Sequence, residues 1–78
     1  MKNIELYKKA FMECFGIDEE SLKTLEYQSI HNWDSVGHMA LIATLEESFD
    51  IVMEIDDIID YSSFEKGKTL LKKYDINI

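Results

Sequence analysis

The stretch that most restricts the fold is residues 35–49, where apolar side chains recur at helical spacing. They cover a wider part of the predicted helix surface than a helix needs in order to pack against a core on one side. The apolar positions are Val36, Met39, Ala40, Ile42, Ala43, Leu45 and Phe49. Asp34 precedes them and is a good N-cap residue, because its carboxylate can accept a hydrogen bond from a free amide of the first turn. We therefore expect a helix that packs on one side and exposes part of its apolar surface to solvent or a partner.

Ser35 lies at the start of this predicted helix. Free N–H groups and the positive end of the helix dipole favour a bound anion at such a position. No general base, triad partner or group of metal ligands lies near Ser35 in the sequence. We therefore interpret it as a serine that is modified rather than one that attacks a substrate. Gly37 costs about 1 kcal/mol in a helix relative to alanine, which indicates either a frayed first turn or a close approach to the backbone.

Residues 3–15 are predicted to form another helix, which ends at Gly16 in the left-handed conformation. Ile17 then folds back as an apolar contact. The apolar stripe contains Ile4, Tyr7, Ala10, Phe11, Cys14 and Phe15. We interpret Cys14 as a small core residue rather than a reactive thiol.

A long connection, residues 17–34, separates these two helices. A short helical turn is expected near residues 18–25, and Leu22, Leu25 and Ile30 are expected to attach the segment to the core. Loops of this length are uncommon in small domains and are often functional.

Beyond residue 49, residues 50–55 are predicted to form an extended, buried connection, since no second strand is available for pairing. A short helix over residues 56–61 follows. Ser62 and Glu65 have the spacing of a capping box, which predicts a last helix to about Tyr74. Gly67 is expected to weaken its first turn, and residues 75–78 are expected to fray. The side chains expected in the core are Phe64, Leu70, Leu71 and Tyr74.

These elements predict an all-α protein, a small four-helix bundle with three longer helices, one short helix and a long first loop. The 78 residues are expected to form a single domain, residues 1–78. A chain of this length buries only roughly 60–65% of its unfolded surface, so it can hold a narrow apolar cleft but not a large active site.

The net charge of −8 excludes nucleic acid and anionic membrane surfaces as expected partners. It favours partners with basic patches. A single cysteine allows no intrachain disulfide and no multi-thiolate metal site. No apolar run approaches the roughly 20 residues of a membrane span, and no signal peptide is recognisable. We therefore expect a cytoplasmic protein without a bound metal.

The triplet Asp34-Ser35-Val36 resembles the Asp-Ser-Leu attachment motif of acyl carrier proteins. The resemblance extends over nearly the whole chain, because that family has the same helix order and the same long first loop. Its serine helix ends in Glu-Glu followed by Phe-Asp, as in Glu46-Glu47-Ser48-Phe49-Asp50 here. Its third helix is acidic, as are Asp56, Asp57 and Asp60. Together these matches are far more specific than the Asp-Ser pair alone.

The resemblance implies that Ser35 carries 4′-phosphopantetheine, attached by a separate phosphopantetheinyl transferase, and that Asp34 caps the helix and orients the site. The arm would hold an acyl group as a thioester for partner enzymes of fatty-acid-like or specialised lipid or secondary metabolite biosynthesis. A non-catalytic, monomeric carrier is implied. The implied partner-binding residues are Val36, Ala40, Ala43, Glu46 and Glu47. The residues implied to shelter the acyl chain are Met39, Ala43, Leu45 and Ile59.

Three departures from the family pattern indicate a specialised carrier. Val36 replaces the usual leucine, Gly37-His38 replaces an acidic or polar pair, and Glu54 stands where proline is common. His38 is expected to be an exposed helix residue, or else a partner contact whose charge follows pH.

Other functions remain open at this point. An aminoacyl, peptidyl or D-alanyl carrier would share the fold and the serine, although the Gly-Gly-His that often precedes that serine is absent. A carrier-like interaction module would lack the prosthetic group and would not need Ser35. A calcium sensor requires an Asp-x-Asp-x-Asp-Gly loop, which is absent. An enzyme is disfavoured because no nucleophile–base pair or metal spacing is found.

Overall fold

The computed structural model describes residues 2–78, and all regular secondary structure in that range is helical. In chain order, the elements are α1 (Asn3–Phe15), the 3₁₀ helix η1 (Glu19–Thr24), α2 (Ser35–Phe49), α3 (Ile55–Asp60), α4 (Phe64–Leu71) and the 3₁₀ helix η2 (Lys72–Tyr74). The prediction of an all-α fold is therefore confirmed. None of these helices is both long and apolar enough to cross a bilayer.

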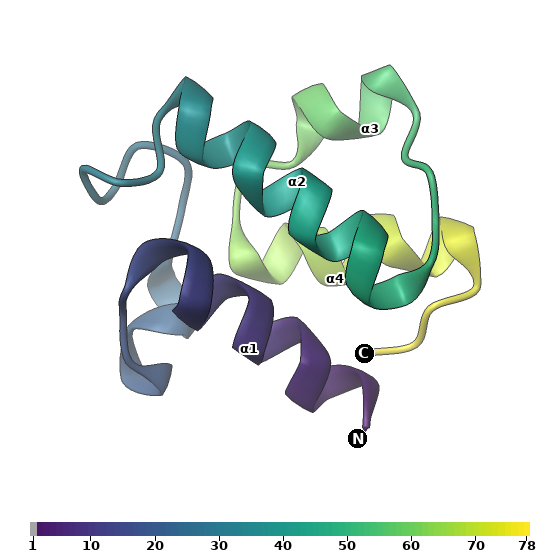
Figure 1. The fold of residues 1–78 in the computed structure, drawn as a ribbon, viewed down its shortest axis with the longest axis horizontal. Coiled ribbons are helices and arrows are strands. Elements are labelled where there is room, and N and C mark those ends of the chain that lie inside the picture. Colours follow the sequence, from purple (N-terminus) through teal and green to yellow (C-terminus); the bar gives the residue numbers. More distant parts are fainter. Residues whose placement is uncertain (1) are drawn as a thin grey trace.

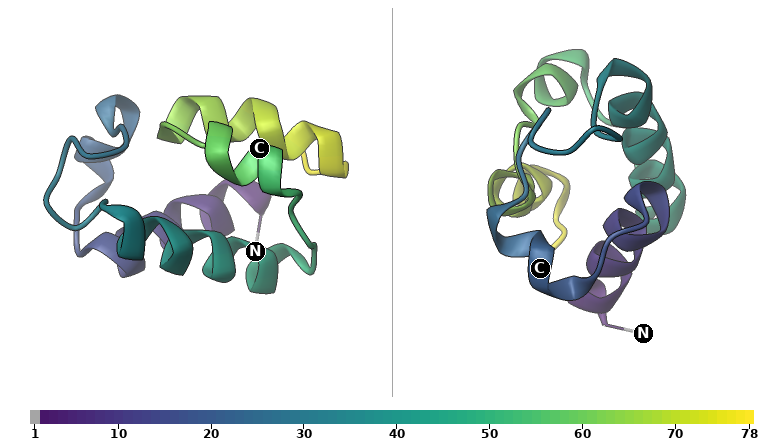
Figure 2. Two further views of the ribbon diagram at one scale, coloured as in Figure 1. Left: turned by 90° about the horizontal axis from the view of Figure 1, so that it is seen from above. Right: turned by 90° about the vertical axis from the view of Figure 1, so that its left-hand side faces the viewer.

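Helices α1 and α2 pack along each other, and α3 and α4 lie on the opposite side of the molecule (Figures 1 and 2). The bounds predicted for the two longest helices are those observed, and Gly16 closes α1 with φ of 64°. Cys14 lies at the edge of the α1–α2 contact, where its Sγ is 3.2 Å from Oγ1 of Thr44. Its side chain is only partly buried, so Cys14 packs at the edge of the core and not, as the sequence had led us to expect, inside it.

A group of five aromatic side chains, here called the aromatic core, fills the space between these layers. Its members are Tyr7, Phe11, Phe15, Trp33 and Phe64. The ring of Phe11 is central, with centroids of Tyr7 and Phe64 at 5.0 Å and that of Trp33 at 5.6 Å. All three pairs meet edge to face, the arrangement that the ring quadrupoles favour. The aromatic core thus joins α1, α4 and the loop that enters α2.

Two buried hydroxyl groups explain the glycine within α4. The Tyr61 hydroxyl donates to the Tyr7 hydroxyl, which donates to the carbonyl of Phe64, both at 2.7 Å. A Cβ at position 67 would overlap both hydroxyl oxygens, so Gly67 permits this close approach rather than merely weakening the helix. Burial raises the pKa of Tyr7 and of Tyr61 well above the ordinary tyrosine value.

At Gly37, too, another part of the chain lies very close to the helix backbone. This was one of the two explanations that the sequence allowed for a glycine at this position. A Cβ there would overlap the backbone carbonyl oxygen of Asn32. The loop before α2 therefore folds tightly against the first turn of the helix, and this contact carries Trp33 into the core.

The connection between α2 and α3 is extended but not buried throughout, which corrects the prediction. Met53 is buried and Ile51 is half-buried, whereas Val52 is 85% exposed. This alternation follows because successive side chains of an extended segment point in opposite directions. Ile55 begins α3 and is 74% exposed.

Helix α4 begins one residue later than a Ser62–Glu65 capping box requires. Ser63 is the N-cap, and its Oγ accepts a hydrogen bond from the Lys66 amide at 2.9 Å. The carbonyl of Ser62 instead accepts from the Tyr27 amide at 2.8 Å, which holds Ser62 outside the helix. The helix ends at Leu71, and η2 continues it to the predicted end at Tyr74.

The C-terminal segment is docked rather than frayed, contrary to prediction. Ile76 is 7% exposed, and its amide donates to the Leu71 carbonyl at 3.2 Å. The Asn3 side-chain amide donates to the Asn77 carbonyl at 3.1 Å, so the two ends of the chain meet. Burial of one isoleucine is the physical reason for this order.

A buried carboxylate connects α3 to η2. Asp57 accepts hydrogen bonds from Lys73 Nζ at 2.7 Å and from the Tyr74 hydroxyl at 2.6 Å. These bonds lower the pKa of Asp57, chiefly through Lys73, and raise the pKa of Lys73. Asp57 is thus a structural residue, although α3 also carries the exposed Asp56 and Asp60.

Candidate functional site

Ser35 is the first residue of α2, and its side chain is exposed. Asp34 caps the helix: its Oδ1 accepts from the Gly37 amide at 2.8 Å, and its carbonyl accepts from the His38 amide at 2.8 Å. Within residues 2–78, the backbone N–H groups of Ser35 and Val36 donate no hydrogen bond. Those two N–H groups therefore remain available to a group placed at the helix start.

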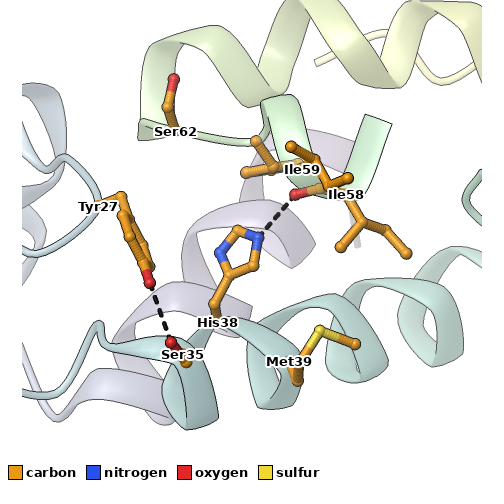
Figure 3. A pocket seen from close by; sticks show the side chains of 8 residues that line it. Tyr27, Ser35, His38, Met39, Ile58, Ile59 and Ser62 are labelled. Carbon is orange, nitrogen blue, oxygen red and sulfur yellow. Dashed lines mark hydrogen bonds between the residues drawn. The ribbon is translucent and has the colours of Figure 1, made fainter. Parts of the chain in front are cut away.

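Tyr27 reaches Ser35 from the long first loop, a contact that we did not predict from the sequence. Its hydroxyl lies 3.3 Å from Ser35 Oγ (Figure 3). The loop is held by an isolated antiparallel bridge between Glu26 and Ser63, with the Phe64 amide donating to the Leu25 carbonyl at 3.0 Å. This bridge places the Tyr27 ring over the start of α2. The only signal in the sequence was the unusual length of the loop.

A pocket of about 330 Å³ opens beside Ser35, between α2 and α3 (Figure 3). Its apolar wall comes from Met39, Ile58 and Ile59. Tyr27, Ser35, His38, Tyr61 and Ser62 complete the lining. No aspartate, glutamate, lysine or arginine contributes to this lining, and His38 is its one basic side chain.

His38 lines this pocket and is half-buried, although the sequence suggested an exposed residue. Trp33 Nε1 donates to His38 Nδ1 at 2.9 Å, because an indole nitrogen can only donate. Nδ1 is therefore unprotonated, so the proton is on Nε2, which donates to the Ile58 carbonyl at 2.7 Å. The imidazole also lies nearly parallel to the Trp33 ring, at 16°. The side chain faces α3, which accounts for its burial.

The residues expected to contact partners lie along α2, but they are not equivalent. Val36 is 80% exposed, and Ala40, Ala43 and Glu47 are also exposed. Glu46 is half-buried, and its carboxylate accepts from the Met53 amide at 2.8 Å. Glu46 therefore holds the α2–α3 connection in place as well as adding charge.

The residues expected to line a cavity are divided among three places. Met39 and Ile59 face each other across the pocket (Figure 3). Leu45 is fully buried in the core, and Ala43 lies on the exposed face of α2. Neither of these two residues lines the pocket.

No group of three or more histidine, cysteine, aspartate or glutamate side chains in the described part of the chain is placed to hold a metal ion. The groups that the site presents are a hydroxyl group, two free amides and a pocket without acidic, lysine or arginine side chains. These features suit attachment of an anionic group at Ser35 and shelter for a small apolar one next to it.

Comparison of the chain with protein-family models, curated proteins and solved structures gave no significant match. Assignment of a function therefore depends on the geometry around Ser35 and on the sequence motifs that surround it.

Proposed function

We propose that this protein is an acyl carrier in which Ser35 bears 4′-phosphopantetheine. The observation that carries the proposal is the position of Ser35: an exposed serine at the capped start of α2, directly beside an uncharged pocket. When bound, this group supplies a thiol on which an acyl group is held as a thioester. The motif residues Asp34-Ser35-Val36 and Glu46-Glu47-Ser48-Phe49-Asp50 support the same function.

The residues around Ser35 fit a phosphodiester, which retains one negative charge. The free amides of Ser35 and Val36 and the helix dipole favour that charge by about 0.3–1 kcal/mol in an exposed position. The Tyr27 hydroxyl is a further donor 3.3 Å from Ser35 Oγ. Asp34 is the nearest carboxylate in sequence, and one of its oxygens is occupied by the Gly37 amide.

We further propose that the exposed face of α2 meets partner enzymes. Val36, Ala40 and Ala43 offer apolar contact, and Glu47 is one of the exposed acidic residues that give the protein its net charge of −8. Such a surface attracts basic patches over long distance, while the apolar residues make the final contact.

The test is the intact mass after incubation with a broad-specificity phosphopantetheinyl transferase, coenzyme A and magnesium. Wild type should gain one phosphopantetheine, and Ser35→Ala should gain none. Ser48→Ala is the matched control, because it removes an exposed serine hydroxyl from the last turn of α2, away from the pocket, and should load as wild type does. Absence of any gain on folded wild type with several transferases would refute the carrier function and favour an interaction module.

A further inference from the structure

We infer that the pocket beside Ser35 takes a short, uncharged acyl group of roughly six carbons or fewer, and that His38 sets this limit. The inference rests on the proposed carrier function. It goes further because it names the class of cargo and the residue that selects it.

The size of the pocket is the first reason. At about 330 Å³ it lies near the lower end of the usual range for small-molecule sites, roughly 300–1,000 Å³. The pocket is also open to solvent, and the end of the arm must share it, so only part of this volume is available to the cargo.

The floor of the pocket is the second reason. His38 and the buried Tyr61 line the pocket, whereas Trp33, the hydrogen-bond partner of His38, is fully buried and does not. Behind the imidazole, Trp33 packs on Phe15 with ring centroids 5.2 Å apart and on Phe11 at 5.6 Å. A longer chain would have to displace the aromatic core in order to continue past His38.

Hydrogen bonds at both ring nitrogens hold His38 in this position. If the imidazole moved aside, the Trp33 indole N–H would lose its partner, and the Ile58 carbonyl would keep only the Tyr61 amide at 3.3 Å. Buried polar groups without a partner are strongly unfavourable. His38 is therefore a fixed barrier rather than a side chain that yields to a longer cargo.

The absence of charge in the lining selects the chemical class. An α-ammonium group, as in an aminoacyl cargo, would find no carboxylate among the lining residues, and a free carboxylate would find no lysine or arginine. A buried charge without a partner is costly. The walls formed by Met39, Ile58 and Ile59 suit an aliphatic group instead.

The experiment compares a series of acyl forms made with a permissive transferase and acetyl-, butyryl-, hexanoyl-, octanoyl- or dodecanoyl-coenzyme A, each verified by intact mass. The thermal midpoint is measured relative to the protein that carries phosphopantetheine alone. The indole N–H signal of Trp33 is followed by NMR, since this is the single tryptophan of the chain. The thermal midpoint should increase with acyl chain length, by on the order of 5 °C at hexanoyl, and should not increase further for longer chains. The chemical shift of the indole signal should stay the same throughout the series.

Three variants test the role of His38. His38→Ala should move the limit to longer chains. His38→Gln should keep it, because an amide can accept from Trp33 and donate to Ile58. Ile59→Ala, at the rim, should reduce stabilisation by every cargo without moving the limit. If His38→Ala does not fold, the wild-type series with its Trp33 signal still decides the question.

The inference is overturned if the midpoint keeps rising through dodecanoyl in wild type while the Trp33 signal shifts. It is also overturned if folded His38→Ala retains the limit, or if a glycyl cargo stabilises more than butyryl. Loading at Ser35 with no dependence on chain length refutes this inference alone, whereas failure to load refutes the carrier function.

Discussion

The aromatic core and the surface between α2 and α3 use apolar side chains in opposite ways. In the core, every ring contacts others and its polar atoms are bonded, as Trp33 Nε1 is to His38. The exposed side chains of α2 and α3, which we call the α2–α3 surface, include four large apolar ones: Val36, Met39, Ile55 and Ile59. A chain of this size has little apolar surface to leave in water unless that surface binds something. Stability therefore belongs to the first region and, under the proposed function, binding belongs to the second, with His38 between them.

The largest expected effect is a loss of stability on substitution in the aromatic core, compared with a small loss on the α2–α3 surface. Phe11→Ala should lower the free energy of unfolding by about 3–5 kcal/mol, because it opens a cavity among four other rings. That is a large part of the total for a domain of this size. Ile59→Ala, on the α2–α3 surface, should change it by about 0.5 kcal/mol or less. Urea denaturation measures both, and equal losses would contradict the division between the regions.

Gly67→Ala should destabilise the protein although alanine is the better helix former. The added methyl group would overlap the Tyr7 and Tyr61 hydroxyls. We expect a net loss of about 1–3 kcal/mol, as for overpacked cores. Thermal and urea unfolding provide the test. A gain of about 1 kcal/mol, the value expected from helix propensity alone, would show that the two hydroxyls are free to move apart.

Glu46 and Glu47 are adjacent in α2 but have different surroundings, so substitutions at the two positions should have different effects. Glu46→Lys should cost about 1 kcal/mol of stability, because it removes the acceptor of the Met53 amide. Glu47→Lys should leave stability unchanged and slow the reaction with a basic transferase, since this side chain is exposed. Unfolding and initial loading rates are measured on both. Equal behaviour of the two variants would contradict their different placement.

The smallest expected effect is the dependence of stability on acidic pH. The bonds from Lys73 and Tyr74 hold the pKa of Asp57 below its ordinary value. The stability from this carboxylate is therefore present above its unfolded pKa, roughly 4, and is lost as pH falls through the lower, folded value. Asp57→Asn should flatten this part of the pH profile of unfolding. An unchanged acidic slope would show that other carboxylates produce it.

Local signals in the sequence were sufficient for the two longest helices. Helical periodicity and the end residues Gly16 and Asp34 gave both sets of bounds, since these features act within a few residues. The burial of Asp57 and the docking of Ile76 were missed, because both depend on contacts with distant segments. An aspartate among other acidic residues gives no local indication that Lys73 will cover it.

The residues of the candidate site could likewise be predicted only where the signal is local in the sequence. Ser35 and Asp34 were evident from the sequence because they belong to one motif. Tyr27 was not, because its place depends on a bridge between residues 26 and 63. His38 looked like a surface residue because nothing local indicates that Trp33 and the Ile58 carbonyl will meet its two nitrogens.

The most direct test of the carrier function is to locate the modification within the chain. Wild type loaded by the transferase is digested, and fragment masses identify the serine that bears phosphopantetheine. The modification should be on Ser35 alone, and not on the other serines, Ser21, Ser29, Ser48, Ser62 and Ser63. A modification on any other serine, or none on folded protein, would contradict the assignment of the start of α2 as the attachment site.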